Sequence, residues 1–194
     1  MRATSFNTPR LTCRDMSDPP AVAIRIGEQL RESDETLATA ESATGGLLSS
    51  LITDVPGSSD YFDRGFVTYA YEAKMGSLGV DRELLDDLGA VCEPVAVNMA
   101  RAARDRAGTT WGVSITGIAG PGGGSVEKPV GTTFIGVASA APWGSGRSLT
   151  TVNEYRFDGD RQEIKRNAAE RALQDLEDRL TEAHGLNDSR NRSG

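Results

Sequence analysis

Residues 36–57, TLATAESATGGLLSSLITDVPG, decide the fold of this chain. The apolar run from Thr36 to Ala40 predicts a buried strand, and a pair of glycines follows it closely. Leucine and isoleucine then recur at helical spacing from residue 47 until Asp-Val-Pro-Gly at 54–57 ends the element. The stretch therefore predicts a strand, a tight loop and a helix, which is the repeating unit of an α/β fold.

Strands and helices alternate outward from this unit. Further strands are expected at residues 65–71, 111–118, 130–138 and 148–157. Further helices are expected from residue 21, over 72–78, around 84–88, from 93 to 107 and from 160 onward. Asp160 and Glu163 form a capping-box pattern at the start of the last helix, whereas Ile24 and Ile26 also permit a short strand. This alternation predicts an α/β layer sandwich.

The composition is that of an acidic globular protein, with 194 residues, 21 Lys+Arg, 28 Asp+Glu and a formal net charge of −7. The length suits one domain, expected at residues 19–184 between a disordered lead-in at 1–18 and a polar tail at 185–194. Without clustered Lys and Arg, no binding of nucleic acid is expected. No stretch approaches the roughly 18 to 20 apolar residues that span a bilayer, and no apolar segment marks a secretion signal. We therefore expect a cytoplasmic protein without membrane partners.

Several common catalytic and metal-binding groups are scarce in this chain. Cys13 and Cys92 are the only cysteines, so neither a disulfide framework nor a thiolate metal site is expected. His184 is the only histidine, and we expect a solvated residue near the end of the last helix rather than a member of a Ser-His-Asp triad. The absence of a dense carboxylate or histidine cluster predicts no bound metal.

The first candidate site is the segment 39–46, between the predicted strand and the next helix. Ligands bind at such strand ends in open α/β sheets, and a helix N-terminus with glycines favours a phosphate or an oxyanion. Ser42 and Thr44 add hydroxyl groups at the same place. The alternative is that Ser or Thr merely caps the helix.

The second candidate is the Gly-rich loop 120–124, with Lys128 beyond it. Its four glycines in five residues match neither a Walker A motif nor a Rossmann fingerprint, and a flexible turn is the alternative. Two glycine-rich loops that come after two strands of one small domain can nevertheless face each other across a cleft.

The third candidate is the segment 68–74, TYAYEAK. Lys74 can act as a general base when burial lowers its pKa, and Tyr69 can pass a proton. Without a usable histidine, a Ser-Lys arrangement is a way to activate a serine. The structural alternative makes Tyr69 a strand-packing residue and Lys74 a solvated helix residue.

Three runs of the chain carry a family likeness: ESATGGLLSSLITDVPGSSDYFDRGFVTYAYEAKMGSLGV, GAVCEPVAVNMA and GVSITGIAGPGGGSVEKPVGTTFIGVA. They resemble the CinA C-terminal-domain family, the nicotinamide-nucleotide amidohydrolases, over about residues 20 to 183. The resemblance implies a three-layer α/β/α sandwich around a mixed sheet. It also implies hydrolysis of the carboxamide of nicotinamide mononucleotide to nicotinic acid mononucleotide and ammonia, a step of pyridine nucleotide salvage, without a cofactor.

Carried over by position, the resemblance makes Ser42 the nucleophile, activated by Tyr69 and Lys74 in an order of proton transfer that stays open. The backbone of the two glycine loops would hold the oxyanion and the rest of the nucleotide, with neither loop assigned to either role. The substrate-binding residues implied in this way are Thr44, Gly45, Gly46, Gly120, Gly122 and Gly123.

The chain departs from the family at Ala43, where many members have cysteine, so no thiol is left in the loop to act as nucleophile. Longer CinA proteins carry an additional N-terminal domain that resembles molybdopterin-binding proteins. This sequence of 194 residues is too short to include that domain, so we expect a stand-alone amidohydrolase. Many α/β enzymes of this size are symmetric homo-oligomers, and we expect the same here. One alternative is a non-catalytic nucleotide-binding or competence-related regulatory module. Another is a phosphate-ester hydrolase, which would usually require a metal.

Overall fold

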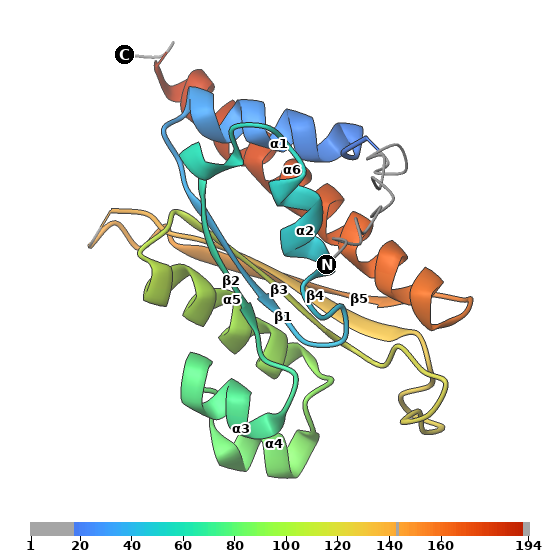
Figure 1. Cartoon of the computed structure of the whole chain (residues 1–194). Coiled ribbons are helices and arrows are strands. Elements are labelled where there is room, and N and C mark those ends of the chain that lie inside the picture. The colour runs from blue at the N-terminus through green and yellow to red at the C-terminus, as the bar shows by residue number, and fades with distance from the viewer. Residues whose placement is uncertain (1–17, 143, 192–194) are drawn as a thin grey trace, which may run out of the picture.

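A mixed five-stranded sheet forms the centre of the computed structural model, which describes residues 18–142 and 144–191 (Figure 1). The strands are β1 (Leu37–Glu41), β2 (Phe62–Val67), β3 (Trp111–Gly117), β4 (Thr132–Ser139) and β5 (Leu149–Arg156). Their order in the sheet is β2-β1-β3-β4-β5. Strand β1 pairs in parallel with β2 and β3, whereas β4 runs antiparallel to both β3 and β5. The predicted mixed sheet is confirmed.

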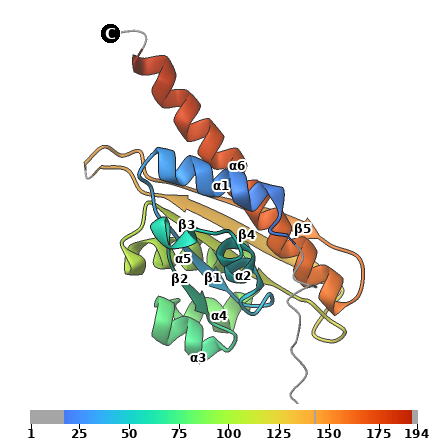
Figure 2. The ribbon, with the colours of Figure 1, turned by 45° about the horizontal axis from the view of Figure 1, so that its top comes forward.

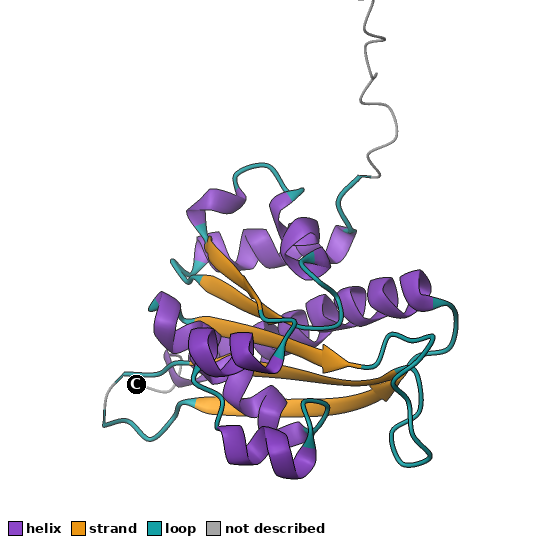
Figure 3. Ribbon diagram, turned by 60° about the horizontal axis from the view of Figure 1, so that its bottom comes forward, coloured by secondary structure: helices purple, strands orange, loops and turns teal. Residues whose placement is uncertain are grey.

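Helices cover both faces of this sheet, as Figures 2 and 3 show. On one face lie α1 (Ala21–Glu32), α2 (Leu47–Thr53) and α6 (Arg161–Asn191). On the other face lie α3 (Tyr71–Ala73), the π-helical turn Lys74–Leu78, α4 (Arg82–Leu88) and α5 (Glu93–Ala107). A short 3-10 turn at Ser58–Asp60 connects α2 to β2. The three-layer α/β/α architecture is therefore confirmed.

Apolar periodicity explains how the layers pack. Strand β1 is buried along its whole length because helices cover it on both faces. Helix α6 buries Ala168, Ala172 and Leu176 at intervals of four residues against one face. On the other face, Gly112 lets α5 lie close to β3, because a Cβ atom there would collide with the Ala100 carbonyl oxygen.

Several element boundaries differ from the sequence prediction, most of all in β2, which begins at Phe62 instead of residue 65. Strand β2 ends at Val67, not at residue 71, because its partner β1 ends at the paired residue Glu41 and leaves no strand to continue the ladder. The chain then leaves the sheet and starts α3 at Tyr71. Helix α6 continues to Asn191, into the segment predicted as a polar tail. Residues 1–17 of the predicted lead-in lie outside the described residues.

The predicted capping box at the start of α6 is confirmed. Asp160 Oδ1 accepts the N–H groups of Gln162 and Glu163 at 2.7 and 3.0 Å, and Glu163 Oε2 accepts the Asp160 N–H at 2.7 Å. Residues 21–32 form a helix, which decides against the alternative of a strand there. None of the helices formed by the described residues combines the length and apolarity that crossing a bilayer requires.

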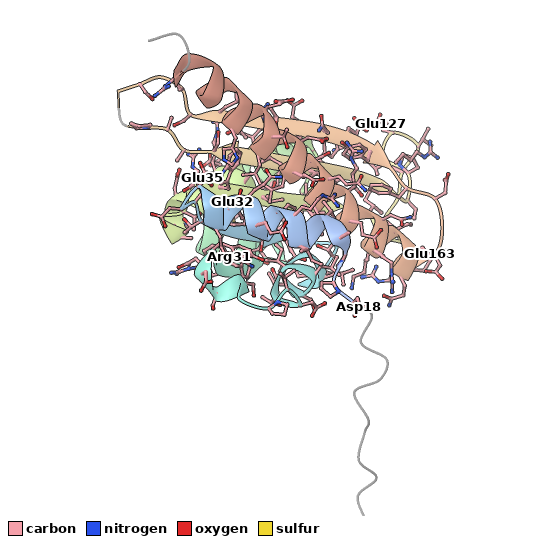
Figure 4. The ribbon with its side chains drawn as sticks, turned by 90° about the horizontal axis from the view of Figure 1, so that it is seen from above. Asp18, Arg31, Glu32, Glu35, Glu127 and Glu163 are labelled. Atoms are coloured by element: carbon pink, nitrogen blue, oxygen red, sulfur yellow. The ribbon has the colours of Figure 1, made fainter. Side chains whose placement is uncertain are left out.

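The sequence predicted that His184 is a solvated residue near the end of the last helix, and this prediction is wrong. His184 contacts the turn before β1. Its Nε2 lies 3.1 Å from Glu35 Oε2, and the same oxygen accepts the Trp111 Nε1–H at 2.8 Å. Figure 4 shows Glu35 at one end of the molecule and Glu163, in the first turn of α6, at the other. Since Ser42 follows the opposite end of β1, His184 lies too far away to serve as its base.

Candidate active site

The structure brings Ser42 and Lys74 into direct contact. Ser42 follows β1 immediately, and its N–H donates to the Ile115 carbonyl oxygen at 3.0 Å, which fixes it beside β3. Lys74 begins the π-helical turn, and its Nζ lies 2.9 Å from Ser42 Oγ. A second hydrogen bond from Nζ to the Thr68 carbonyl oxygen at 2.7 Å orients the amine. The amine is therefore positioned to exchange a proton with the serine hydroxyl.

Burial lowers the pKa of Lys74, which favours this proton exchange. Its side chain is 1% exposed, and it forms no ion pair with a carboxylate of the described residues. Desolvation favours the neutral amine and lowers the pKa of Lys74 from 10.5 to about 8. The alternative of a solvated Lys74 is wrong, and a substantial fraction of the amine is neutral near pH 8.

Glu41 shapes the loop that carries Ser42, a role that was not predicted. Its side chain is fully buried, and its carboxylate accepts N–H groups from Gly46, Leu48 and Ser49 at 2.9, 3.1 and 2.8 Å, and the Ser49 hydroxyl at 2.6 Å. Gly45 and Gly46 have φ angles of +65° and +99°, which let the loop turn back over the carboxylate. The sequence feature that could have indicated this role is an acidic residue, Glu41, directly after the predicted buried strand.

The backbone amides of this loop divide into two pairs. Gly45 donates its N–H to the Ser42 carbonyl oxygen at 3.1 Å and Gly46 donates to Glu41, so both amides are engaged within the loop. No described residue accepts a hydrogen bond from the amides of Ala43 and Thr44. The Thr44 hydroxyl is buried and has no described partner. Two free donors thus directly follow Ser42.

A cavity of about 240 Å³ opens beside Ser42. It is lined by Ser42, Ala43, Tyr69, Gly117, Ile118, Ala119, Gly120, Gly122, Gly123 and Arg161. The second glycine-rich loop thus faces Ser42 and Ala43 of the first across one cavity, as predicted, whereas the predicted binding residues Thr44, Gly45 and Gly46 lie outside its lining. Lys128 lies outside this lining, and its Nζ ties the second loop to the end of α4 through the Leu88 carbonyl oxygen at 2.8 Å.

Tyr69 lines this cavity but does not stand between Ser42 and Lys74, which touch directly. Its side chain is 59% exposed, so the alternative of a strand-packing residue is wrong. The Tyr69 hydroxyl accepts a hydrogen bond from Arg161 Nη2 at 2.7 Å, and Arg161 Nη1 donates to the Gly120 carbonyl oxygen at 2.5 Å. Arg161 was not predicted, because no local pattern connects the start of α6 to these distant segments.

Two other features bear on the choice of site. A larger cavity of about 670 Å³ lies between Arg104, Thr109 and Ser148, at the opposite end of β3, and its lining holds no pair of a hydroxyl and a neutral amine. Within the described part of the chain, no three His, Cys, Asp or Glu side chains gather as a metal site would require. The cavity beside Ser42 is therefore the candidate active site.

Comparison with known proteins identifies relatives along most of the chain. A CinA-like protein of Chlorobium limicola is 48% identical over 160 residues, which are 82% of this chain and 37% of that protein. The nicotinamide-nucleotide amidohydrolase PncC of Escherichia coli is 47% identical over 152 residues, which are 78% of this chain and 88% of that protein. The chain spans roughly a third of the length of the first curated relatives it matches, from 29% to 37%.

Solved structures share the fold. A competence-damaged protein (CinA) superfamily protein from Klebsiella pneumoniae superposes with a TM-score of 0.76 and 29% sequence identity, covering 83% of this chain and 96% of that one. The model of the CinA C-terminal domain matches residues 20–180, which include every residue of the cavity lining. The chain therefore belongs to the CinA C-terminal domain family.

Proposed function

We propose that this chain hydrolyses the carboxamide of nicotinamide mononucleotide, giving nicotinic acid mononucleotide and ammonia, with Ser42 as the nucleophile. The observation that carries the proposal is the buried Lys74 amine 2.9 Å from Ser42 Oγ, beside a cavity that Ser42 lines. The amidohydrolase named for its action on nicotinamide nucleotides in Escherichia coli, 47% identical, supports the choice of substrate.

The reaction proceeds in two halves. Neutral Lys74 accepts the Ser42 proton, Ser42 Oγ bonds to the carboxamide carbon, and the protonated amine then gives its proton to the departing nitrogen. The C–N bond breaks, ammonia leaves, and an ester to Ser42 remains. Water attacks this ester while Lys74 takes a proton from the water, and the ester C–O bond breaks. Lys74 returns the proton to Ser42 Oγ, which releases the acid and restores the pair.

The amides of Ala43 and Thr44 serve as donors to the oxyanion in this mechanism. They follow the nucleophile directly and are free, whereas the amides of Gly45 and Gly46 are engaged within the loop. A donor of this kind contributes about 2.7 to 4 kcal/mol to the transition state. Gly45 and Gly46 shape the loop, while Gly120, Gly122 and Gly123 form the opposite wall against the nucleotide.

The direct Ser42–Lys74 contact supports a proton transfer that runs through Lys74 alone. Tyr69 then acts as part of the cavity wall, held by Arg161. A non-catalytic nucleotide-binding module, the main alternative, has no use for a buried amine beside a serine, because burying a lysine without a counter-charge destabilises the fold. Homo-oligomeric assembly and a cytoplasmic location stay predictions.

Ammonia release from nicotinamide mononucleotide tests the proposal. We expect release by the purified chain, its loss in Ser42→Ala, and its retention in the matched control Ser50→Ala, which removes an exposed hydroxyl. A trapped ester to Ser42, seen as an increase in intact mass, would add direct support. Binding of the nucleotide without release would favour the binding module instead.

A further inference from the structure

We propose that the outer edge of β5 is the surface on which a second copy of this chain docks. The β5 strand of the second copy runs antiparallel to it, so that two five-stranded sheets join into one (Figure 1). This assembly goes beyond the proposed function, because each copy keeps a site of its own. Chain length alone predicted a homo-oligomer, whereas the edge strand identifies a surface and a register.

The backbone of β5 has one row of polar groups without partners. Ala140 donates its N–H to the Thr110 carbonyl oxygen at 2.8 Å, so the even-numbered residues of β4 face β3 and the odd-numbered ones face β5. The register then turns the odd-numbered residues of β5 toward β4, in agreement with the Phe157 N–H, which donates to the Gly131 carbonyl oxygen at 3.1 Å. The even-numbered residues point their N–H and C=O groups away from the sheet, and no described residue bonds to these groups: Thr150, Val152, Glu154 and Arg156.

The opposite edge of the sheet is protected in ways that β5 is not. Strand β2 has six residues, its register with β1 shifts between Leu37 and Ala38, and it exposes the charged side chains of Asp63 and Arg64. Short length, an irregular ladder and exposed charges keep edge strands from pairing. Strand β5 has eight residues in an unbroken ladder, without proline, glycine or lysine. Strand β5 is therefore the edge that suits another strand.

Both faces of β5 are held in place by the helices. On one face, Arg101 of α5 donates to the Thr150 hydroxyl at 2.9 Å. On the other face, Asp175 of α6, which is 4% exposed, accepts the Tyr155 hydroxyl at 2.8 Å and the Asn153 amide at 3.3 Å. A strand fixed in this way loses little conformational entropy when it pairs.

One antiparallel register pairs all four outward-facing residues, with the two-fold axis at Asn153. Thr150 then lies opposite Arg156 of the second copy, and Val152 lies opposite Glu154. Each pair exchanges two backbone hydrogen bonds and symmetry doubles the pairs, which gives about eight bonds. An axis at Glu154 would place two carboxylates opposite each other. An axis at Val152 would leave the backbone groups of Arg156 beyond the end of the partner strand.

The side chains on the α6 face of β5 complement those of the second copy in this register. Leu149, a large apolar side chain that is 46% exposed, lies opposite Phe157 of the second copy. Thr151 lies opposite Tyr155, a pair of a β-branched and an aromatic residue that stabilises antiparallel sheets. The adjoining hollow of about 240 Å³ between β5 and α6 is lined by two arginines, two aspartates and one glutamate, so its charge is nearly balanced.

The assembly leaves both candidate active sites open. Ser42 follows the carboxyl end of β1, and β5 runs in the same direction as β1. Because the two β5 strands run in opposite directions, the two sites lie at opposite ends of the joined sheet. Disruption of the assembly should therefore leave kcat and KM unchanged.

Analytical ultracentrifugation of the full chain tests the assembly. We expect a dimer, and Val152→Pro should raise its Kd about 30-fold, because the missing N–H removes two of the symmetric bonds. The Val152 N–H points outward, so this variant keeps the ladder to β4. Asn153→Lys places two ammonium groups opposite each other across the axis and should abolish the dimer. Thr53→Lys is the matched control, since it adds the same charge at an exposed position of α2.

Cysteine crosslinking tests the register. The variants are made with Cys13→Ser, and Cys92 is buried. Asn153→Cys should form a disulfide between two chains on treatment with diamide, because the Cα atoms of a directly opposite, non-hydrogen-bonded pair lie about 4.5 Å apart. Glu154→Cys is the matched control, because its symmetry copy is a diagonal neighbour at about 7 to 8 Å, and it should not crosslink.

Three outcomes would overturn the proposal. A monomer at every concentration tested would exclude the assembly. A dimer with the same Kd in wild type, Val152→Pro and Asn153→Lys would place the interface elsewhere. A disulfide in Glu154→Cys and none in Asn153→Cys would exclude the register. Ammonia release is measured separately, so a β5-dependent dimer without release would support the assembly and count against the proposed function alone.

Discussion

Raising the pH from 6 to 9 is expected to activate the Ser42–Lys74 pair, because the neutral amine alone can accept the serine proton. Burial lowers the pKa of Lys74 from 10.5 to about 8. About a hundredth of the amine is then neutral at pH 6, about a tenth at pH 7 and half at pH 8. We expect kcat/KM for nicotinamide mononucleotide to rise about tenfold from pH 6 to pH 7 and to level off above pH 8.

The same displacement of the pKa links Lys74 to stability. Between pH 8 and 10.5 the unfolded chain holds a proton on this amine that the folded chain has released, so stability rises with pH through this window and is constant below it. At 1.36 kcal/mol for each pKa unit, the burial of the charged form costs about 3 kcal/mol. Lys74→Met removes this cost but loses two hydrogen bonds of about 1 kcal/mol each, to Thr68 and to Ser42. The variant should be about 1 kcal/mol more stable at pH 7, with kcat lower by about 10²- to 10⁴-fold.

Lysine NMR connects the pH profile to one residue. The chain has three lysines, Lys74, Lys128 and Lys165, so ¹³C labelling at Cε gives three signals. One signal should titrate near pH 8 and disappear in Lys74→Met. Titration of all three signals above pH 10, or near-normal turnover by folded Lys74→Met, would refute the assignment of Lys74 as the base.

Three further outcomes are expected. Glu41→Gln should lower the free energy of unfolding by about 2 to 4 kcal/mol and lower kcat, because the charge-assisted bonds to the Ser42 loop are weakened; chemical denaturation showing wild-type stability would contradict the role of Glu41. Tyr69→Phe should change kcat only a few-fold, since Ser42 and Lys74 touch directly, and a loss of about 10³-fold would return Tyr69 to the proton path. Activity should survive EDTA, and a strong loss that added divalent metal reverses would refute the metal-free mechanism.

Local pattern was sufficient for the elements that determine the architecture. The strand, loop and helix of residues 36–57 and the capping box at Asp160 are confirmed, because apolar periodicity and cap chemistry act over a few residues. The predicted end of β2 was wrong because the observed end depends on where the partner strand β1 ends. Residues that favour strands, such as Tyr69, continue past that point in the sequence. Strand propensity cannot show the length of a neighbour.

The candidate site was predictable in part. Ser42 and Lys74 belong to motifs that a family resemblance identifies, and the fold places them together across the strand ends. Glu41 was missed because three of its four hydrogen bonds come from backbone amides, which any residue type supplies, so its only local signal was an acidic residue at the end of an apolar strand. Arg161 was missed because it reaches the cavity from a helix that begins 92 residues after Tyr69.

The π-helical turn that starts at Lys74 fixes the number of residues between the catalytic amine and the chain that follows it into α4. Such a turn closes its hydrogen bonds over five residues instead of four, so it contains one residue more than an α-helical turn. Deleting Gly76 would let the segment close as an ordinary turn and rotate the chain beyond it by about 100° relative to Lys74. Gly76→Ala changes no spacing, and nothing lies within 4 Å of the added carbon. The turn thus tolerates a substitution at Gly76 but not a change in the number of its residues, a constraint that governs which insertions and deletions this site can survive.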